Sequence, residues 1–173
     1  LKMDMEHGKT IVRYSEEKNG KLEWYSKEVQ LAFPTVSYSP VKINDDVLIQ
    51  KIKKAGSMGN VSLQADTCYM PSAVQENKGE RPYFPRVFIL AEQKSGMIMD
   101  FEMYKSINDD ANVTLNKLIN ICLEKGIPKE IQVRSEAMAA ILDDFCKKTD
   151  IKLKVVKRLS VIDHFIEEMA YRF

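Results

Sequence analysis

The sequence predicts an α/β protein whose mixed sheet carries helices on its faces. Residues 87–91 form an apolar run without alternation, which is typical of a strand buried on both faces. The turn Lys94-Ser95-Gly96 leads into a second extended segment, so these two strands should pair antiparallel. From Asp109 onward, helical and strand patterns alternate, which favours a sheet with a parallel half.

Three local patterns precede these elements. The Asn-Gly pair at residues 19–20 predicts a hairpin over residues 10–31, because both positions of a type I′ turn need a positive φ. A helix is predicted to start from a cap at Asn44 or Asp45. Residues 60–70 alternate between apolar and polar side chains, which predicts a half-buried strand.

The most polar segment, residues 75–81, is the predicted boundary between two parts of the chain. Residues 1–78 should form a small α+β part that contains the hairpin, the helix and the alternating strand. Residues 82–173 should form a larger α/β domain. Its predicted elements are strands 87–91 and 97–104, a helix from Asp109 or Asp110, strand 131–133, a helix capped by Ser135, strand 151–155 and a helix capped by Ser160.

Charge and composition narrow the classes of function. The 173 residues carry 26 basic and 25 acidic side chains, so no whole-protein field attracts nucleic acid or an anionic membrane. Three widely spaced cysteines and two histidines form no recognised zinc motif. No apolar run approaches the roughly 20 residues of a membrane span. We therefore predict a cytoplasmic protein with no resident metal or cofactor.

Two motifs carry a resemblance to known families. The run Gly-Ile-Pro-Lys-Glu-Ile-Gln-Val at residues 126–133, with Phe-Cys-Lys-Lys at residues 145–148, is similar to the integrase-core segment around its second carboxylate. Residues 82–173 thereby resemble the ribonuclease H-like fold. Residues 45–173 also resemble an uncharacterised bacterial domain family that shares the Arg-Pro-Tyr-Phe-Pro motif and the pattern Gly-x-Pro-x-x-Ile-x-Val-Arg. That second family brings no known activity.

The ribonuclease H-like scaffold usually opens with three antiparallel strands. Between Tyr104 and Asp109 there is no room for a third strand, so residues 60–70 are a candidate for it from the N-terminal side. The resemblance also implies an aspartate in the middle of the first strand. We match that strand to the segment ending Ile-Leu-Ala-Glu, where Ala91 cannot bind a metal and Glu92 lies at the strand end.

The second carboxylate position of the family corresponds to Arg134, whose fixed positive charge repels a metal ion. These departures predict a non-catalytic binding or interaction module on a degenerate ribonuclease H-like scaffold. The alternative is a divergent metal-dependent nuclease or phosphoryl-transfer enzyme. Its site would combine Glu92, Glu136 and Asp163 with Mg²⁺ or Mn²⁺.

Arg134 and Ser135 are also candidates for an anion site, because a helix N-terminus favours negative charge. The simpler interpretation is that Arg134 pairs with Glu130 or Glu136. A basic cluster follows in the chain, and a solvated strand face explains it better than a phosphate-binding patch. The basic cluster consists of Lys147, Lys148, Lys152, Lys154, Lys157 and Arg158.

We expect an unknown protein or a small anionic ligand as partner, with nucleic acid possible but not favoured.

Overall fold

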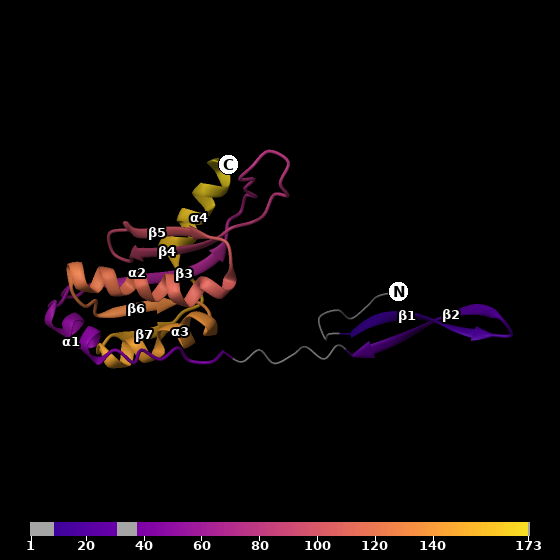
Figure 1. Cartoon of the computed structure of the whole chain (residues 1–173), viewed down its shortest axis with the longest axis horizontal. Coiled ribbons are helices and arrows are strands. Elements are labelled where there is room, and N and C mark those ends of the chain that lie inside the picture. Colours follow the sequence, from indigo (N-terminus) through magenta and orange to yellow (C-terminus); the bar gives the residue numbers. More distant parts are fainter. Residues whose placement is uncertain (1–8, 31–37, 173) are drawn as a thin grey trace. The chain divides into compact units, whose positions relative to one another are not determined.

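The computed structural model describes residues 9–30 and 38–172, which belong to two compact units, Leu1–Ser37 and Tyr38–Phe173 (Figure 1). The first unit contains an antiparallel hairpin of β1 (Lys9–Lys18) and β2 (Lys21–Gln30). Its two turn residues, Asn19 and Gly20, have φ values of 53° and 74°, as the type I′ turn requires. The predicted hairpin is therefore confirmed over the described residues, and residue 31 lies outside them.

The second unit is built on a five-stranded sheet in the order β5-β4-β3-β6-β7. The central strand β3 pairs antiparallel with β4 and parallel with β6. The outer pairs are antiparallel β4 with β5 and parallel β6 with β7. The strands are β3 (Ser62–Tyr69), β4 (Arg86–Glu92), β5 (Ile98–Tyr104), β6 (Glu130–Val133) and β7 (Lys152–Val155).

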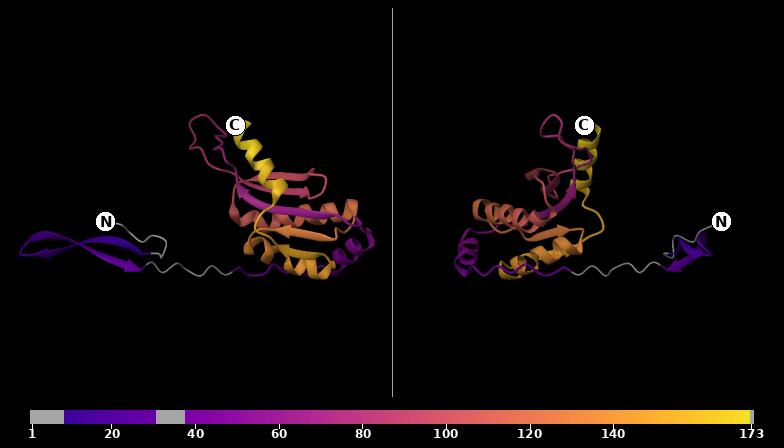
Figure 2. Two further views of the ribbon diagram at one scale, coloured as in Figure 1. Left: turned by 180° about the vertical axis from the view of Figure 1, so that it is seen from behind. Right: turned by 45° about the vertical axis from the view of Figure 1, so that its right-hand side comes forward.

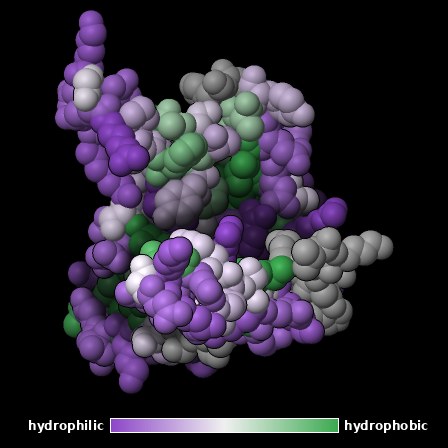
Figure 3. All heavy atoms as spheres, turned by 90° about the vertical axis from the view of Figure 1, so that its right-hand side faces the viewer, coloured by the Kyte–Doolittle hydropathy of each residue, from purple (hydrophilic) through white to green (hydrophobic). Residues whose placement is uncertain are grey.

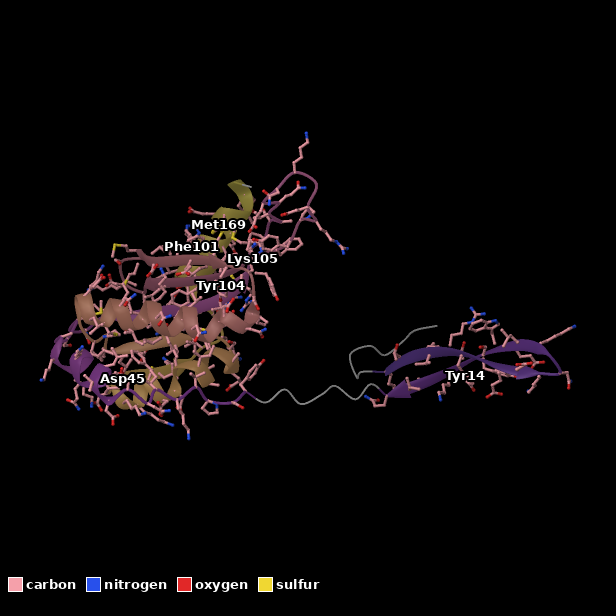
Figure 4. The ribbon with its side chains drawn as sticks, viewed as in Figure 1. Tyr14, Asp45, Phe101, Tyr104, Lys105 and Met169 are labelled. Carbon is pink, nitrogen blue, oxygen red and sulfur yellow. The ribbon has the colours of Figure 1, made fainter. Side chains whose placement is uncertain are left out.

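Helices cover both faces of this sheet, so the predicted α/β class is confirmed (Figures 1 and 2). One face packs against α1, α2 and α3, and the opposite face packs against α4. Figure 4 marks Phe101 of β5 and Met169 of α4, which belong to the core on the α4 face. On the side shown in Figure 3, hydrophilic residues predominate at the surface. The helices are α1 (Asp46–Lys54), the short 3₁₀ helix η2 (Ile107–Asp109), α2 (Asp110–Lys125), α3 (Glu136–Lys148) and α4 (Ser160–Arg172).

Side-chain caps begin two of these helices as the sequence predicts. The Leu48 N–H donates to Asp45 Oδ1 at 2.9 Å, and the Met138 N–H donates to Ser135 Oγ at 3.1 Å. The start of α4 differs from the prediction. Ser160 is its first helical residue and not its cap. The Val161 N–H donates instead to Oε1 of Gln64 in β3, at 3.0 Å.

The place of β3 corrects the sequence analysis. We assigned residues 60–70 to the N-terminal part, but the structure makes this strand the centre of the sheet. Its antiparallel pairing with β4 confirms residues 60–70 as the third antiparallel strand. The compact unit begins at Tyr38, well before the boundary expected at residues 75–81. That polar segment belongs to the β3–β4 connection, where Val74 and Tyr83 form an antiparallel bridge. The polarity of residues 75–81 therefore reflects an exposed connection within the sheet unit and not a boundary between domains.

No helix in residues 9–30 and 38–172 combines the length and apolarity needed to cross a membrane.

Candidate functional site

Asp66 lies in the middle of the central strand and points toward α4. It stands opposite Ile89 in the β3–β4 register, and Ile89 belongs to the core on the α4 face. Only 3% of the Asp66 surface is exposed. A buried carboxylate is unfavourable unless a cation or several donors compensate it, so its partners define the site.

The partner is Arg134, the residue that follows β6, the parallel neighbour of β3. The Arg134 Nε–H donates to Asp66 Oδ2 at 2.6 Å. On its other side, Arg134 Nη1 lies 2.7 Å from Oδ1 of Asp163, in the first turn of α4. One guanidinium thus joins two carboxylates from two different elements. We call Asp66, Arg134 and Asp163 the arginine bridge.

Burial and charge act in opposite directions at the arginine bridge. Burial raises the pKa of the Asp66 carboxyl, and the Arg134 guanidinium only partly offsets this rise. Burial alone would lower the pKa of Arg134, but the two carboxylates raise it above its usual value. Arg134 therefore stays charged, and Asp66 depends on it for compensation.

Beside the bridge is an open pocket of about 590 Å³. Arg134 and Asp163 are one third exposed here, at 33% and 31% of their side-chain surface, so the bridge is reachable from solvent. The residues that line the pocket are Arg134, Arg158, Ser160, Asp163, His164, Ile166 and Glu167.

The structure does not bring the predicted catalytic set together. Glu92 is three positions beyond Ile89, about 10 Å along the strand from the level of Asp66, and accepts a hydrogen bond from Ser95 Oγ. Glu136 is exposed in the first turn of α3. Of the three carboxylates in that set, Asp163 alone reaches the bridge.

Metal binding fits the bridge poorly. A divalent ion prefers several converging carboxylates, whereas this site offers two carboxylates with a guanidinium between them. Among residues 9–30 and 38–172, no three His, Cys, Asp or Glu side chains lie close enough together to hold a metal ion.

Arg134 has other ion-pair partners than the ones the sequence suggested, whereas Ser135 caps α3 as predicted. Arg134 pairs with Asp66 and Asp163, while Glu130 pairs with Lys152 at 3.1 Å. The Ser135 hydroxyl accepts the α3 capping hydrogen bond. The Nε and Nη1 groups of Arg134 are engaged by these two carboxylates, and the anion site at Arg134 and Ser135 stays a prediction.

Sequence reasoning missed Asp66 because the alternation of residues 60–70 suggested a solvent-facing polar side. One signal was available. If residues 60–70 open the scaffold, Asp66 falls in the middle of the first strand, where the resemblance implies an aspartate. The structure makes β3 the first strand of the sheet meander and β4, which ends at Glu92, the second.

A second buried ion pair, on the opposite face, also escaped the sequence analysis. Arg86, with 8% of its side chain exposed, pairs with Asp110 at the start of α2. The hydroxyl of Tyr104, which Figure 4 labels, donates to Asp110 at 2.7 Å, and Arg86 donates to Thr67 at 3.0 Å. The Tyr69 ring lies 4.7 Å from the guanidinium carbon. Because its groups satisfy one another, this cluster joins β4 to α2 and serves the fold.

Residues 48–170 match the family model described as a domain of unknown function, DUF6930. The chain belongs to this family. The match covers all of the five-stranded sheet and all three residues of the arginine bridge. A comparison of the DUF6930 chain with curated proteins gives no match.

Solved structures similar to the DUF6930 chain include integrase and transposase complexes. An intasome of simian T-cell lymphotropic virus in complex with a PP2A regulatory subunit is 13% identical, with a TM-score of 0.47 over 65% of this chain and 40% of that one. The HTLV-2 integrase catalytic core in complex with magnesium is 16% identical, with a TM-score of 0.41 over 61% of this chain and 64% of that one. The Mos1 mariner paired-end complex with Mn is 8% identical, with a TM-score of 0.34 over 84% of this chain and 61% of that one.

These likenesses concern the fold alone. The DUF6930 chain spans 40% and 64% of the lengths of the two viral chains. The strand order and the helices on both faces of the sheet confirm the mixed α/β fold expected from the sequence.

Proposed function

We propose that this DUF6930 chain is a non-catalytic binding module in which an arginine replaces the metal centre of a ribonuclease H-like scaffold. The observation that carries the proposal is the arginine bridge. Arg134 contacts one oxygen each of Asp66 and Asp163, at 2.6 and 2.7 Å.

The physical argument concerns competition for the same carboxylates. Phosphoryl transfer by two metals needs ions about 4 Å apart, each held by carboxylate oxygens and free to bind substrate. Arginine stays protonated at every physiological pH, so its charge cannot be titrated away from Asp66. A divalent ion entering the bridge would have to break two ion pairs and then lie beside a fixed positive charge.

The alternative is a divergent metal-dependent nuclease, and one observation favours it. Asp66 and Asp163 both reach a single cation, so they could share one divalent ion if Arg134 turned into the adjoining pocket. Under this hypothesis, activity would depend on Asp66 together with Asp163, and not on Glu92 or Glu136.

The two hypotheses are separated by metal binding and cleavage. The wild-type chain is incubated with Mg²⁺ or Mn²⁺ and with single-stranded and structured nucleic acids, and we expect no cleavage. We also expect no rise in melting temperature with Mn²⁺. Cleavage by the wild type that Asp66→Asn abolishes would establish the nuclease instead.

A gain-of-function variant sharpens this test. Arg134→Asp supplies a third carboxylate at the bridge, so Mn²⁺ should stabilise the variant by about 1.4 kcal/mol at ten times its Kd. Arg158→Asp is the matched control, because it makes the same charge change at an exposed residue that lines the same pocket. Equal Mn²⁺ stabilisation of the control would count against a site at the bridge.

We also place the module in the cytoplasm. Cys68, Cys122 and Cys146 are free thiols, and two of them are buried in the core between the sheet and its three helices. Unpaired cysteines used as small hydrophobic residues fit a reducing compartment.

A further inference from the structure

Strand β7 is an open edge of the sheet. Within the described residues, its one strand neighbour is β6. The N–H groups of Lys152 and Val156 donate to the carbonyls of Lys129 and Val133 on the β6 side. Because backbone groups alternate in direction along a strand, those of Leu153 and Val155 point outward. Val155 is 48% exposed, so this edge is accessible.

Positive charge gathers on the α4 face beside this edge. Leu153 packs against the core formed by α1, α2 and α3. Because neighbouring side chains of a strand point to opposite faces, Lys152 and Lys154 project to the α4 face. The main strand contacts of helix α4 are with β4 and β3, so β6 and β7 lie to one side of this helix (Figure 2). Lys157 and Arg158 follow in the β7–α4 connection and are exposed.

These cations are incompletely neutralised. Glu130 pairs with Lys152, and its carboxyl is held at a lowered pKa by the Gln132 hydrogen bond, by Lys152 and by nearby Lys154. Lys154, Lys157 and Arg158 form no ion pair with any residue in the ranges 9–30 and 38–172. Of these four cations, Lys152 alone has an ion-pair partner in the ranges 9–30 and 38–172, namely Glu130.

The rest of the predicted basic cluster is neutralised within α3. Lys147 pairs with Asp143 at 2.7 Å and Lys148 with Asp144 at 3.0 Å. The excess charge is thus confined to β7 and the connection after it.

We propose that β7 binds an extended, acidic segment of a partner protein by strand addition, with alternate carboxylates of that segment opposite Lys152 and Lys154. The outward backbone groups of Leu153 and Val155 supply the hydrogen bonds of the new ladder. Lys157 and Arg158 extend the positive surface beyond the strand end and bind further carboxylates.

Neither edge protection nor nucleic-acid binding accounts for the whole of this surface. Lysines on an edge strand prevent unwanted pairing, but this role does not explain unpaired Lys157 and Arg158 outside the strand. Nucleic acid is disfavoured because four cations are fewer than the roughly 6–10 phosphate contacts of typical DNA-binding proteins. No aromatic residue for base stacking lies between Lys152 and Arg158.

This inference rests on the proposed function, since it names the partner of a binding module. The test uses the full chain and a fluorescein-labelled decapeptide of alternating glutamate and threonine, followed by fluorescence anisotropy. A lysine–threonine decapeptide, an oligothymidylate and a short DNA duplex are the comparison probes. We expect the glutamate peptide to bind and the lysine peptide not to bind.

Variants locate the binding surface. Lys154→Glu/Arg158→Glu should weaken binding of the glutamate peptide roughly tenfold, because attraction becomes repulsion at two contacts. The control Lys94→Glu/Lys125→Glu makes the same charge change at exposed lysines on other elements and should leave the affinity unchanged. Equal affinities for both double variants would overturn the assignment to β7.

A modified peptide tests strand addition without altering the protein. Methylation of alternate backbone nitrogens keeps the charges and removes donors, so one of the two methylated registers should also bind roughly tenfold more weakly. Unchanged affinity in both registers would overturn strand addition. Tighter binding of either nucleic acid would overturn the partner class.

A complete lack of peptide binding up to about 1 mM would also overturn the inference. That outcome is distinct from a failure of the proposed function, which is decided by metal binding and cleavage.

Discussion

Arg134→Met tests directly whether the arginine bridge compensates a buried charge. The variant keeps most of the side-chain volume and removes both ion pairs of Arg134. Asp66, only 3% exposed, is then left without the guanidinium that lies 2.6 Å away in the wild type. Asp163 is 31% exposed, so water can hydrate it in place of the lost partner.

The expected loss of stability follows from this difference in burial. Removing one partner of a fully buried ion pair costs about 3–5 kcal/mol. Since Arg134 is 33% exposed, solvent screens part of the interaction, and we expect a loss of about 2–3 kcal/mol. Asp66→Asn/Arg134→Met should recover at least half of that loss, because no unpaired buried charge remains.

Urea unfolding followed by far-ultraviolet circular dichroism measures these values. The single tryptophan, Trp24, lies in the hairpin unit, so its fluorescence does not report on the sheet unit. Arg158→Met is the control, because Arg158 is exposed and lines the same pocket, and its effect should stay within about 0.5 kcal/mol.

The pH dependence gives a second readout. Burial raises the pKa of Asp66 in the folded state, and loss of Arg134 raises it further. The folded variant then binds a proton that the unfolded chain releases, so its stability increases as pH falls through this interval. The deficit of Arg134→Met relative to wild type should therefore shrink between neutral pH and about pH 4.

Two results would refute the reasoning about the bridge. One is a loss in Arg134→Met no larger than that in Arg158→Met. The other is a double variant with Asp66→Asn that is no more stable than Arg134→Met alone.

Three further predictions concern the frame around the site. Arg86→Met should destabilise the sheet unit by about 3–5 kcal/mol in urea unfolding, since it leaves the Asp110 carboxylate, whose side chain is 13% exposed, without its cation, and a smaller loss in Arg86→Met/Asp110→Asn is the check. Gly126→Ala should lower stability by about 1–3 kcal/mol in the same assay, because φ is 97° and the new Cβ would lie 3.0 Å from the Gly56 carbonyl; no loss would contradict this packing. Gln64→Ala should cost about 1 kcal/mol and speed amide exchange in the first turn of α4, whose N–H it accepts, and unchanged exchange would exclude this cap.

Local chemistry in the sequence was sufficient for much of the fold. The Asn-Gly turn, the caps at Asp45 and Ser135, and the buried apolar run of β4 each depend on a few neighbouring residues. Such signals survive without tertiary information because backbone dihedrals, capping bonds and side-chain periodicity are set within one or two turns of chain. The α/β class and the order of elements followed from them.

The tertiary structure alone decided the site. Asp66, Arg134 and Asp163 are separated by 68 and 29 positions in the chain, and no periodicity links them. Their meeting depends on β3 lying between β4 and β6, which is a property of strand pairing. Alternation along residues 60–70 distinguishes two faces of a strand, but only the packing of α4 on one face determines that its polar side is buried. The sequence therefore determined which elements form, whereas long-range pairing determined which charges meet.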